Sequence, residues 1–375
     1  MLSRLRKSLV LLAKLAVTAA LLWWVVSGVR WHDYVVTAAG RPLRVLEARG
    51  DRLRVAEGPG PQWRRRSDFQ SLQGQIVRPG MAGVLGRLQI PLCLLAAAIL
   101  AGQLTLMGVR WWYLMRFQSL TVSLPAAIRL MFVGHFFNFF LPGSTGGDVI
   151  RAYLVTKRTD SRTVAVATVL LDRFAGLAGM AFLAGVMTLA TWGSPQTRRA
   201  ALAVAVTVAI IVVAGLVLFS RRVGKLLRLD ALLDRLPRRE NFQTAIRTLR
   251  LLPRSPRTAA VVAAMTLGVH LLLAGGIACL GGALGLSVPV RLYFLFVPVI
   301  YILAAVPVSI GGLGVVEGMY VVFFAQPAGM DTSAVVALSL LARFMPMLLS
   351  LPGLVFWLSE RGASRRAAEA KGDAT

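Results

Sequence analysis

The chain has 375 residues, of which 57% are hydrophobic and 15% are charged, and its formal net charge is +26. This composition excludes a soluble enzyme and indicates an integral membrane protein. Lys and Arg lie mainly between and beside the apolar runs, where each contributes about 1 kcal/mol of attraction to anionic headgroups, so the charge predicts a lipid surface and no nucleic-acid partner. Two cysteines, Cys93 and Cys279, lie in apolar runs and predict neither a disulfide nor a metal site.

The first apolar run, residues 15–26, follows several basic residues and resembles the start of a secretory signal. Because no small-residue cleavage site follows and Trp23 and Trp24 suit a membrane interface, residues 1–27 are predicted to hold an uncleaved first span. In residues 28–86, apolar and polar residues alternate between Gly, Pro and Asp turn signals, as they do in short β-strands. This segment is predicted to be a small β-rich extracytoplasmic insert that leans on the membrane domain because its own core is small.

Residues 87–360 are predicted to form the main membrane domain. Five further full spans are expected at residues 88–109, 164–192, 200–219, 258–280 and 333–358. The second span is expected to end in an interfacial belt of basic and aromatic residues that begins at Arg110. Residues 220–257 interleave arginine with leucine at three- and four-residue spacing, which predicts amphipathic helices on the cytoplasmic leaflet. The basic tail, residues 361–375, is predicted to be disordered.

Two short stretches, residues 141–151 and 306–317, share the pattern Pro-x-Ser-x-Gly-Gly with a carboxylate soon after it. Their apolar arms are shorter than the roughly 20 residues that a membrane-crossing helix needs, so each stretch is predicted to be the tip of a re-entrant hairpin. The predicted tip residues are Pro142, Ser144, Gly146 and Gly147 in the first hairpin and Pro307, Ser309, Gly311, Gly312 and Gly314 in the second. Interrupted segments at corresponding places in two halves indicate a shared polar site. Close helix packing is an alternative reason for the glycines.

The distribution of basic residues predicts an orientation. If the amino terminus is cytoplasmic, the basic loop at 220–257, residues 157–162 and the carboxy terminus are cytoplasmic as well, and the insert is the exception to the positive-inside rule. The first hairpin then enters from the cytoplasm and the second from outside, as in an inverted-topology repeat. The predicted fold is therefore an all-α polytopic protein of the plasma (inner) membrane, with about six full spans and two re-entrant helical hairpins in inverted repeat.

Charged side chains within apolar segments are functional candidates, because each costs at least ~2.5 to 3.5 kcal/mol on insertion scales. The candidate substrate-binding residues are Asp148, Arg151, Asp172, Arg173, Glu317 and Arg343, three acids and three bases that could be neutral overall, together with His135 and Asn138 one turn apart before the first tip. Arginine suits a phosphate because its planar fork donates two parallel hydrogen bonds. The half-helix that starts at the first glycine pair would add backbone N–H groups and the positive end of its dipole. A structural role in packing or insertion is the alternative, above all for Asp172 with Arg173, and His270 fits a satisfied core histidine.

The sequence gives no positive support for covalent or metal catalysis. It contains no Ser-His-Asp spacing, metal-ligand cluster or Cys-His pair that stands out, and the glycine stretches lack the lysine of a nucleotide-binding loop. We therefore expect no cofactor and no enzymatic activity.

Three ordered blocks of this sequence, residues 135–153, 171–177 and 307–318, resemble the signature blocks of the flippase-like membrane domain of lysylphosphatidylglycerol synthases. The resemblance covers about residues 88–360. It implies a stand-alone member, because in the bifunctional synthases a soluble aminoacyl-transferase domain follows the membrane part, whereas this chain stops at Thr375. The β-rich insert is not part of the family's pattern.

The sequence and the resemblance together predict a lipid translocase that moves a polar or anionic headgroup of a phospholipid or glycolipid between leaflets. Arg151, and secondarily Arg173 and Arg343, would hold a phosphate, while Asp148 and Glu317 would balance them or relay protons. An intramembrane enzyme with one of these acids or His135 as acid or base remains an alternative. A second alternative is an accessory protein whose insert recruits an envelope partner. The sequence does not specify the lipid, the direction, the energy coupling or the oligomeric state.

Overall fold

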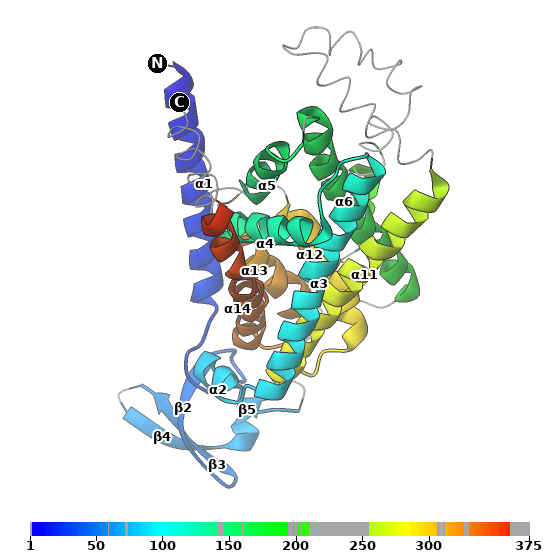
Figure 1. Cartoon of the computed structure of the whole chain (residues 1–375). Coiled ribbons are helices and arrows are strands. Elements are labelled where there is room, and N and C mark those ends of the chain that lie inside the picture. Colours follow the sequence, from blue (N-terminus) through cyan, green and yellow to red (C-terminus); the bar gives the residue numbers. More distant parts are fainter. Residues whose placement is uncertain are drawn as a thin grey trace.

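The computed structural model describes residues 2–58, 60–71, 74–140, 146–159, 161–193, several positions between 198 and 213, 255–305, 309, 312–325 and 330–360. In these residues, a helix bundle carries one small sheet at its end (Figure 1). Four helical segments are long and apolar enough to cross a membrane, namely α3 (Ile90–Phe117), α6 (Arg162–Ala190), α11 (Pro256–Ala283) and Thr332–Glu360, which begins with α14 (Thr332–Leu349).

These four segments correspond to four of the six predicted spans. Helix α1 (Leu2–Ser27) lies at the predicted first span and contains the shorter apolar segment Leu15–Ser27. The predicted span 200–219, the basic segment 220–257 and the tail 361–375 lie wholly or mostly outside the described residues. The count of six spans therefore stays a prediction.

The bundle is built on helices that approach closely. Helix α3 packs along α11, and a Cβ atom on Gly276 of α11 would lie 2.8 Å from the side chain of Leu100 on α3, so the glycine permits this approach. Ile277 and Leu100 are almost completely buried there. Large apolar side chains such as Leu94 and Leu189 are exposed on the outside of the bundle, which suits contact with lipid tails.

Shorter helices flank both predicted hairpin tips. Helix α4 (Leu124–Phe140) packs against α5 (Gly146–Thr156) before and after the first tip. Helix α12 (Val290–Ala304) precedes the second tip, and α13 (Val315–Tyr320) follows it and continues into the π-helical turn η4 (Val321–Ala325). Residues 141–145, 306–308, 310 and 311, which include Pro142, Ser144, Pro307 and Gly311, lie outside the described part. That each segment re-enters on the same side of a membrane stays a prediction.

The insert contains the predicted β structure. Its strands are β1 (Tyr34–Thr37), β2 (Pro42–Arg49), β3 (Arg52–Glu57), β4 (Gly60–Arg65) and β5 (Phe69–Gln70). All pairings are antiparallel, and the order is β4-β3-β2-β1-β5. The core of the sheet is small and centres on Val35, Leu53, Val55 and Phe69. A 3₁₀ turn, η1 (Arg66–Asp68), links β4 to β5, and α2 (Met81–Gly86) ends the insert against α14.

Polar contacts join the insert to the start of α14. The Tyr34 hydroxyl on β1 donates a hydrogen bond to Asp331, which caps α14 by accepting from the backbone N–H of Ser333 at 2.8 Å. The Ser333 hydroxyl in turn accepts from the backbone N–H of Arg30 at 3.0 Å. The prediction that the insert leans on the membrane domain is thus confirmed, while its position outside the cytoplasm stays a prediction.

Candidate functional site

A cavity of about 280 Å³ lies between the helices that flank the two tips and the long helices α3, α6, α11 and α14. Seven of the eight predicted substrate-binding residues line it, namely His135, Asn138, Asp148, Arg151, Asp172, Arg173 and Arg343. The eighth, Glu317, is 2% exposed and bonds to the lining residue Arg343. The tertiary structure therefore gathers the predicted residues in one place, and their role in binding a substrate stays a prediction.

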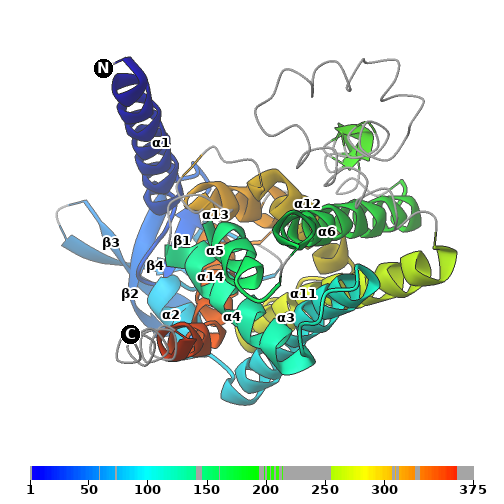
Figure 2. The same cartoon turned by 45° about the horizontal axis from the view of Figure 1, so that its top comes forward.

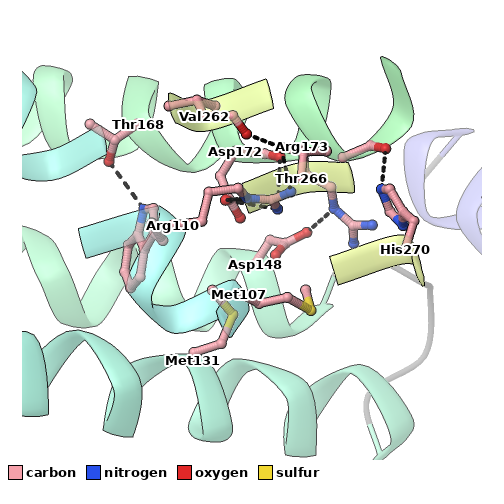
Figure 3. Close-up of polar contacts among 12 residues, drawn as sticks. Met107, Arg110, Met131, Asp148, Thr168, Asp172, Arg173, Val262, Thr266 and His270 are labelled. Carbon is pink, nitrogen blue, oxygen red and sulfur yellow. Dashed lines mark hydrogen bonds and ion pairs between the residues drawn. The ribbon is translucent and has the colours of Figure 1, made fainter. Parts of the chain in front are cut away.

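Asp172 on α6 is the centre of the first charged cluster. Its Oδ1 accepts a hydrogen bond from Arg110 Nε at 3.0 Å (Figure 3), and its Oδ2 accepts one from Arg151 Nη2 at 3.2 Å. Arg110 also donates from Nη1 to the Thr266 hydroxyl on α11 at 3.1 Å. One buried carboxylate thus joins α3, α5 and α6, and its two guanidinium partners offset the cost of removing it from water.

Asp148 at the start of α5 forms the second part of the cluster. Its Oδ1 lies 3.3 Å from Arg151 Nη2, and its other oxygen accepts a hydrogen bond from Arg173 on α6. Asp148 and Arg151 share a helix face because they are three residues apart. Two carboxylates therefore compete for Arg151, which is only 2% exposed.

The Arg151 guanidinium packs against an aromatic ring and a sulfur atom inside the bundle. Its guanidinium carbon lies 4.4 Å from the centre of the Trp111 ring, in cation–π geometry, and its Nη1 lies 2.9 Å from the Met131 sulfur. The Trp111 ring nitrogen donates to the Thr168 hydroxyl at 3.3 Å, which fixes the ring. Among the described residues, the buried Nε of Arg151 has no hydrogen-bond partner. One N–H donor of Arg151, the residue most favoured for phosphate binding, is therefore unused, and this atom is itself buried.

The second tip is tied to α14 by one ion pair. Arg343 Nε donates to Glu317 Oε1 at 2.5 Å, and Arg343 Nη2 donates to the Gly312 carbonyl at 3.1 Å. The other Glu317 oxygen accepts from the backbone N–H of Gly314 at 2.7 Å. Gly312 and Gly314 have φ angles of 70° and 77°, a left-handed conformation that favours glycine. Thus the tip needs these glycines for its backbone shape.

The glycines also serve close packing, as the alternative interpretation expected. A Cβ atom on Gly314 would lie 2.5 Å from the side chain of Leu21 on α1, and one on Gly147 would lie 1.7 Å from the Gly134 carbonyl oxygen. In the first hairpin, the backbone N–H of Gly147 donates to the Asn138 side chain at 2.9 Å. Asn138 therefore orients the first turn of α5, a role that the sequence did not indicate.

Three other predicted residues, His135, Gly146 and Ser309, take no part in the ion pairs described above. His135 packs edge to face against Phe139, with ring centres 5.4 Å apart. Gly146 begins α5, and Ser309 at the second tip is 3% exposed, with no hydrogen-bond partner for its hydroxyl in the described part of the chain.

Arg110 is the residue that sequence reasoning missed. It was expected in an interfacial belt, but that prediction is wrong because α3 continues to Phe117, and Arg110 and Trp111 are 2% and 0% exposed. The six predicted residues, three acids and three bases, could be neutral overall. With Arg110 included, four arginines face three carboxylates among the described ion pairs of the site, so these seven residues carry a formal net positive charge. The mostly apolar residues after Arg110 could have indicated that the helix continues past it, because seven more helical residues follow.

His270 differs in part from its expected role as a satisfied core histidine. It lines the cavity, and its Nε2 donates to the Gly176 carbonyl at 2.9 Å, since a carbonyl oxygen can only accept. Its Nδ1 is buried without a hydrogen-bond partner among the described residues. The ring therefore offers one unused nitrogen near the cavity. No group of three or more His, Cys, Asp or Glu side chains suited to a metal ion occurs in that part of the chain.

Comparisons with known proteins give one family. The model described as the lysylphosphatidylglycerol synthase TM region matches residues 81–353, which begin at α2 and include every residue of the cavity. No curated protein matches the chain, and no solved structure matches it. Together with the four apolar helices, the match identifies a multi-pass membrane protein. The chain belongs to the lysylphosphatidylglycerol synthase transmembrane-region family.

Proposed function

We propose that the protein is a lipid translocase that moves a polar or anionic headgroup between leaflets through the cavity, without altering the lipid chemically. Family membership and the membrane helices indicate a membrane protein involved in lipid handling. The observation that carries the proposal further is the surplus of arginine at the cavity: four arginines and three carboxylates, of which Arg110, Arg151, Asp172 and Glu317 are buried and the other three are partly exposed. An anionic headgroup would neutralise this surplus in a region where water is scarce, so its electrostatic attraction is strong.

In this proposal the carboxylates hold the arginines in place until the headgroup arrives. Arg151 is shared by Asp148 and Asp172 at 3.3 and 3.2 Å, and its buried, unused Nε would supply a further donor when the side chain turns toward the headgroup. A phosphate that replaces one carboxylate would receive two parallel N–H donors from one guanidinium. Arg173 and Arg343 would complete the contact, and the freed Asp148 or Glu317 could take a proton. The acyl chains would remain in the bilayer.

The same geometry offers a route for the movement of the tips. The Glu317–Arg343 pair fixes the second tip through Gly312 and Gly314, so a headgroup that attracts Arg343 would weaken these bonds. The Asp148–Arg173 pair would respond in the same way at the first hairpin. Alternation between these two sets of bonds would open the cavity to one leaflet and then to the other. The movement would run downhill or be coupled to an ion gradient, in the plasma membrane with both chain termini cytoplasmic.

The proposal is tested with purified full-length protein in liposomes that contain phospholipids and glycolipids with chemically accessible headgroups. Headgroup movement should be lost in Arg151→Ala and strongly reduced in Arg151→Lys, because lysine keeps the charge without the planar fork. Arg116→Ala on the exposed end of α3 is the matched control and should move lipid as the wild type does. Size-exclusion profiles and circular dichroism establish that each variant is folded, and Arg151→Lys carries the test if Arg151→Ala does not fold.

Two outcomes would reject the proposal. If folded wild-type protein moves no lipid of either class, the accessory interpretation is preferred. If mass spectrometry of the extracted lipids shows a chemically altered headgroup that Arg151→Lys fails to produce, the protein is an intramembrane enzyme.

A further inference from the structure

One face of the insert carries arginines in register across three neighbouring strands. Arg52 on β3 is paired directly with Arg49 on β2 and with Arg65 on β4. In the adjacent row, Arg54 is paired with Glu47 and with Trp63. These six residues, called the arginine face below, point away from the face that holds Leu53 and Val55, since successive side chains of a strand alternate.

The arginine face is unfavourable for the sheet by itself. Like charges directly opposite each other destabilise a pair of strands. Glu47 is the one acidic member, and it lies 2.6 Å from Arg49 and 3.8 Å from Arg54. Among the described residues, no carboxylate oxygen lies within 4 Å of a side-chain nitrogen of Arg52 or Arg65. The Arg49 side chain is 74% exposed and Trp63 is 42% exposed. The charge therefore remains open to an external anion.

The sheet that carries the arginine face follows one apolar helix and precedes another at short distance along the chain. Helix α1 ends at Ser27 and β1 begins at Tyr34, so the sheet starts within a few residues of the apolar helix, and α3 begins soon after the insert. The headgroup layer is only about 5 to 8 Å deep on each side of the hydrocarbon core. In both overall views the hairpin of β3 and β4 extends beyond the helix bundle on the side of α1 (Figure 1, Figure 2). Trp31, which is 63% exposed, lies in the same junction and suits an interface.

We propose that the arginine face is a second anion-binding surface, separate from the cavity, that binds the phosphates of anionic lipid headgroups beside the bundle. The guanidinium groups would supply paired donors to the phosphates, and Trp63 would place its ring at the headgroup level. We favour a lipid surface over a soluble polyanion because the hairpin extends beyond the helix bundle beside α1 (Figure 1, Figure 2) and is joined to apolar helices at both ends of the insert. This inference does not depend on translocation.

The experiment uses full-length protein in nanodiscs of phosphatidylcholine alone or mixed with phosphatidylglycerol. Cys93→Ala and Cys279→Ala remove the native thiols, and a fluorophore is attached through Ala56→Cys, which lies on the arginine face, or through Ala48→Cys, which is paired with Leu53 and lies on the opposite face. Nitroxide at the headgroup of a tracer lipid quenches a fluorophore that touches the surface. We expect strong quenching at position 56 and weak quenching at position 48 in the anionic nanodiscs, and loss of the difference at high salt.

The triple variant Arg49→Ala, Arg52→Ala and Arg65→Ala should lower the ratio of docked to undocked insert by about a hundredfold, which is the expected combined effect of three basic residues at a surface. The matched control removes the same charge with Arg41→Ala, Arg64→Ala and Arg87→Ala, exposed arginines of the insert region outside the arginine face, and should keep most of the quenching. Equal quenching in phosphatidylcholine alone, or equal loss in both triple variants, would overturn the proposal. Displacement of the insert from anionic nanodiscs by stoichiometric inositol hexaphosphate would overturn it in favour of a soluble polyanion.

Discussion

Arg110 on α3 donates from Nε to Asp172 on α6 across 3.0 Å, and the two side chains are 2% and 3% exposed. The bond connects residues 62 positions apart and places an arginine at the cavity that hydropathy alone assigned to the membrane surface. Through Asp172 it also fixes Arg151, the residue we propose for phosphate binding. A substitution that removes this bond should therefore lower both the stability of the protein and the proposed lipid movement.

Replacing Arg110 should be strongly destabilising. Among the described residues, Arg110→Ala leaves Asp172 with Arg151 on α5 as its remaining ion-pair partner, and breaking a buried pair on one side costs about 3 to 5 kcal/mol. The measurement is thermal unfolding in detergent, with Arg116→Ala as the exposed control on the same helix. The double variant Arg110→Met with Asp172→Leu should recover part of the loss, because the buried carboxylate that lost its partner is gone and Arg151 keeps Asp148 at 3.3 Å. A double variant less stable than Arg110→Ala would contradict this account.

Gly147→Ala should disrupt the first hairpin. The added Cβ atom would lie 1.7 Å from the Gly134 carbonyl oxygen, so α4 and α5 must separate, at a cost of about 1 to 3 kcal/mol or more. Gly185→Ala on α6 is the matched control, because nothing lies within 4 Å of its added Cβ, and it should be neutral or stabilising by up to about 1 kcal/mol. Melting temperatures of the two variants compare these effects directly, and equal values would show that α4 and α5 are not in contact at Gly147.

Glu317→Gln should loosen the second tip. The substitution removes the charge that holds Arg343 at 2.5 Å and weakens the acceptor of the Gly314 N–H, while the side-chain volume is unchanged. Hydrogen exchange at residues 312–317 should become about tenfold faster, which corresponds to a loss of about 1.4 kcal/mol in local protection. Glu360→Gln, which alters a more exposed pair with Arg158, serves as the control and should leave this region unchanged. Unaltered exchange in Glu317→Gln would show that the ion pair does not fix the tip.

Tyr34→Phe should weaken the attachment of the sheet to α14. Burial, and after it the bond to Asp331, raises the pKa of Tyr34 above its ordinary value, so the neutral hydroxyl is stabilised in the folded protein. The stability from this shift is fully present below the ordinary tyrosine pKa of about 10 and is lost as the pH rises through the higher folded value. We expect Tyr34→Phe to lose about 1 kcal/mol and also the alkaline part of the pH dependence. Chemical unfolding of both proteins from pH 7 to 11 measures this, and parallel pH profiles would contradict it.

The sequence determined the features that depend on neighbours along the chain. The runs that became α3, α6, α11 and the segment from Thr332 are apolar over enough residues to predict spans, and alternation with turn signals predicted the sheet. The cost of a charge in an apolar run likewise marked Asp148, Arg151, Asp172, Arg173, Glu317 and Arg343, most of which line the cavity.

Only the tertiary structure decided which of these groups meet. From the sequence, Arg110 could lie at an interface or in a core, and its bonds to Asp172 on α6 and Thr266 on α11 place it in the core. Tyr34 bonds to a residue 297 positions away along the chain. Gly147 is required because the Gly134 backbone lies against it, a contact that neither glycine encodes alone. The physical reason is that hydropathy and periodicity act over a few residues, whereas charge pairing and close packing depend on which distant helices share a boundary.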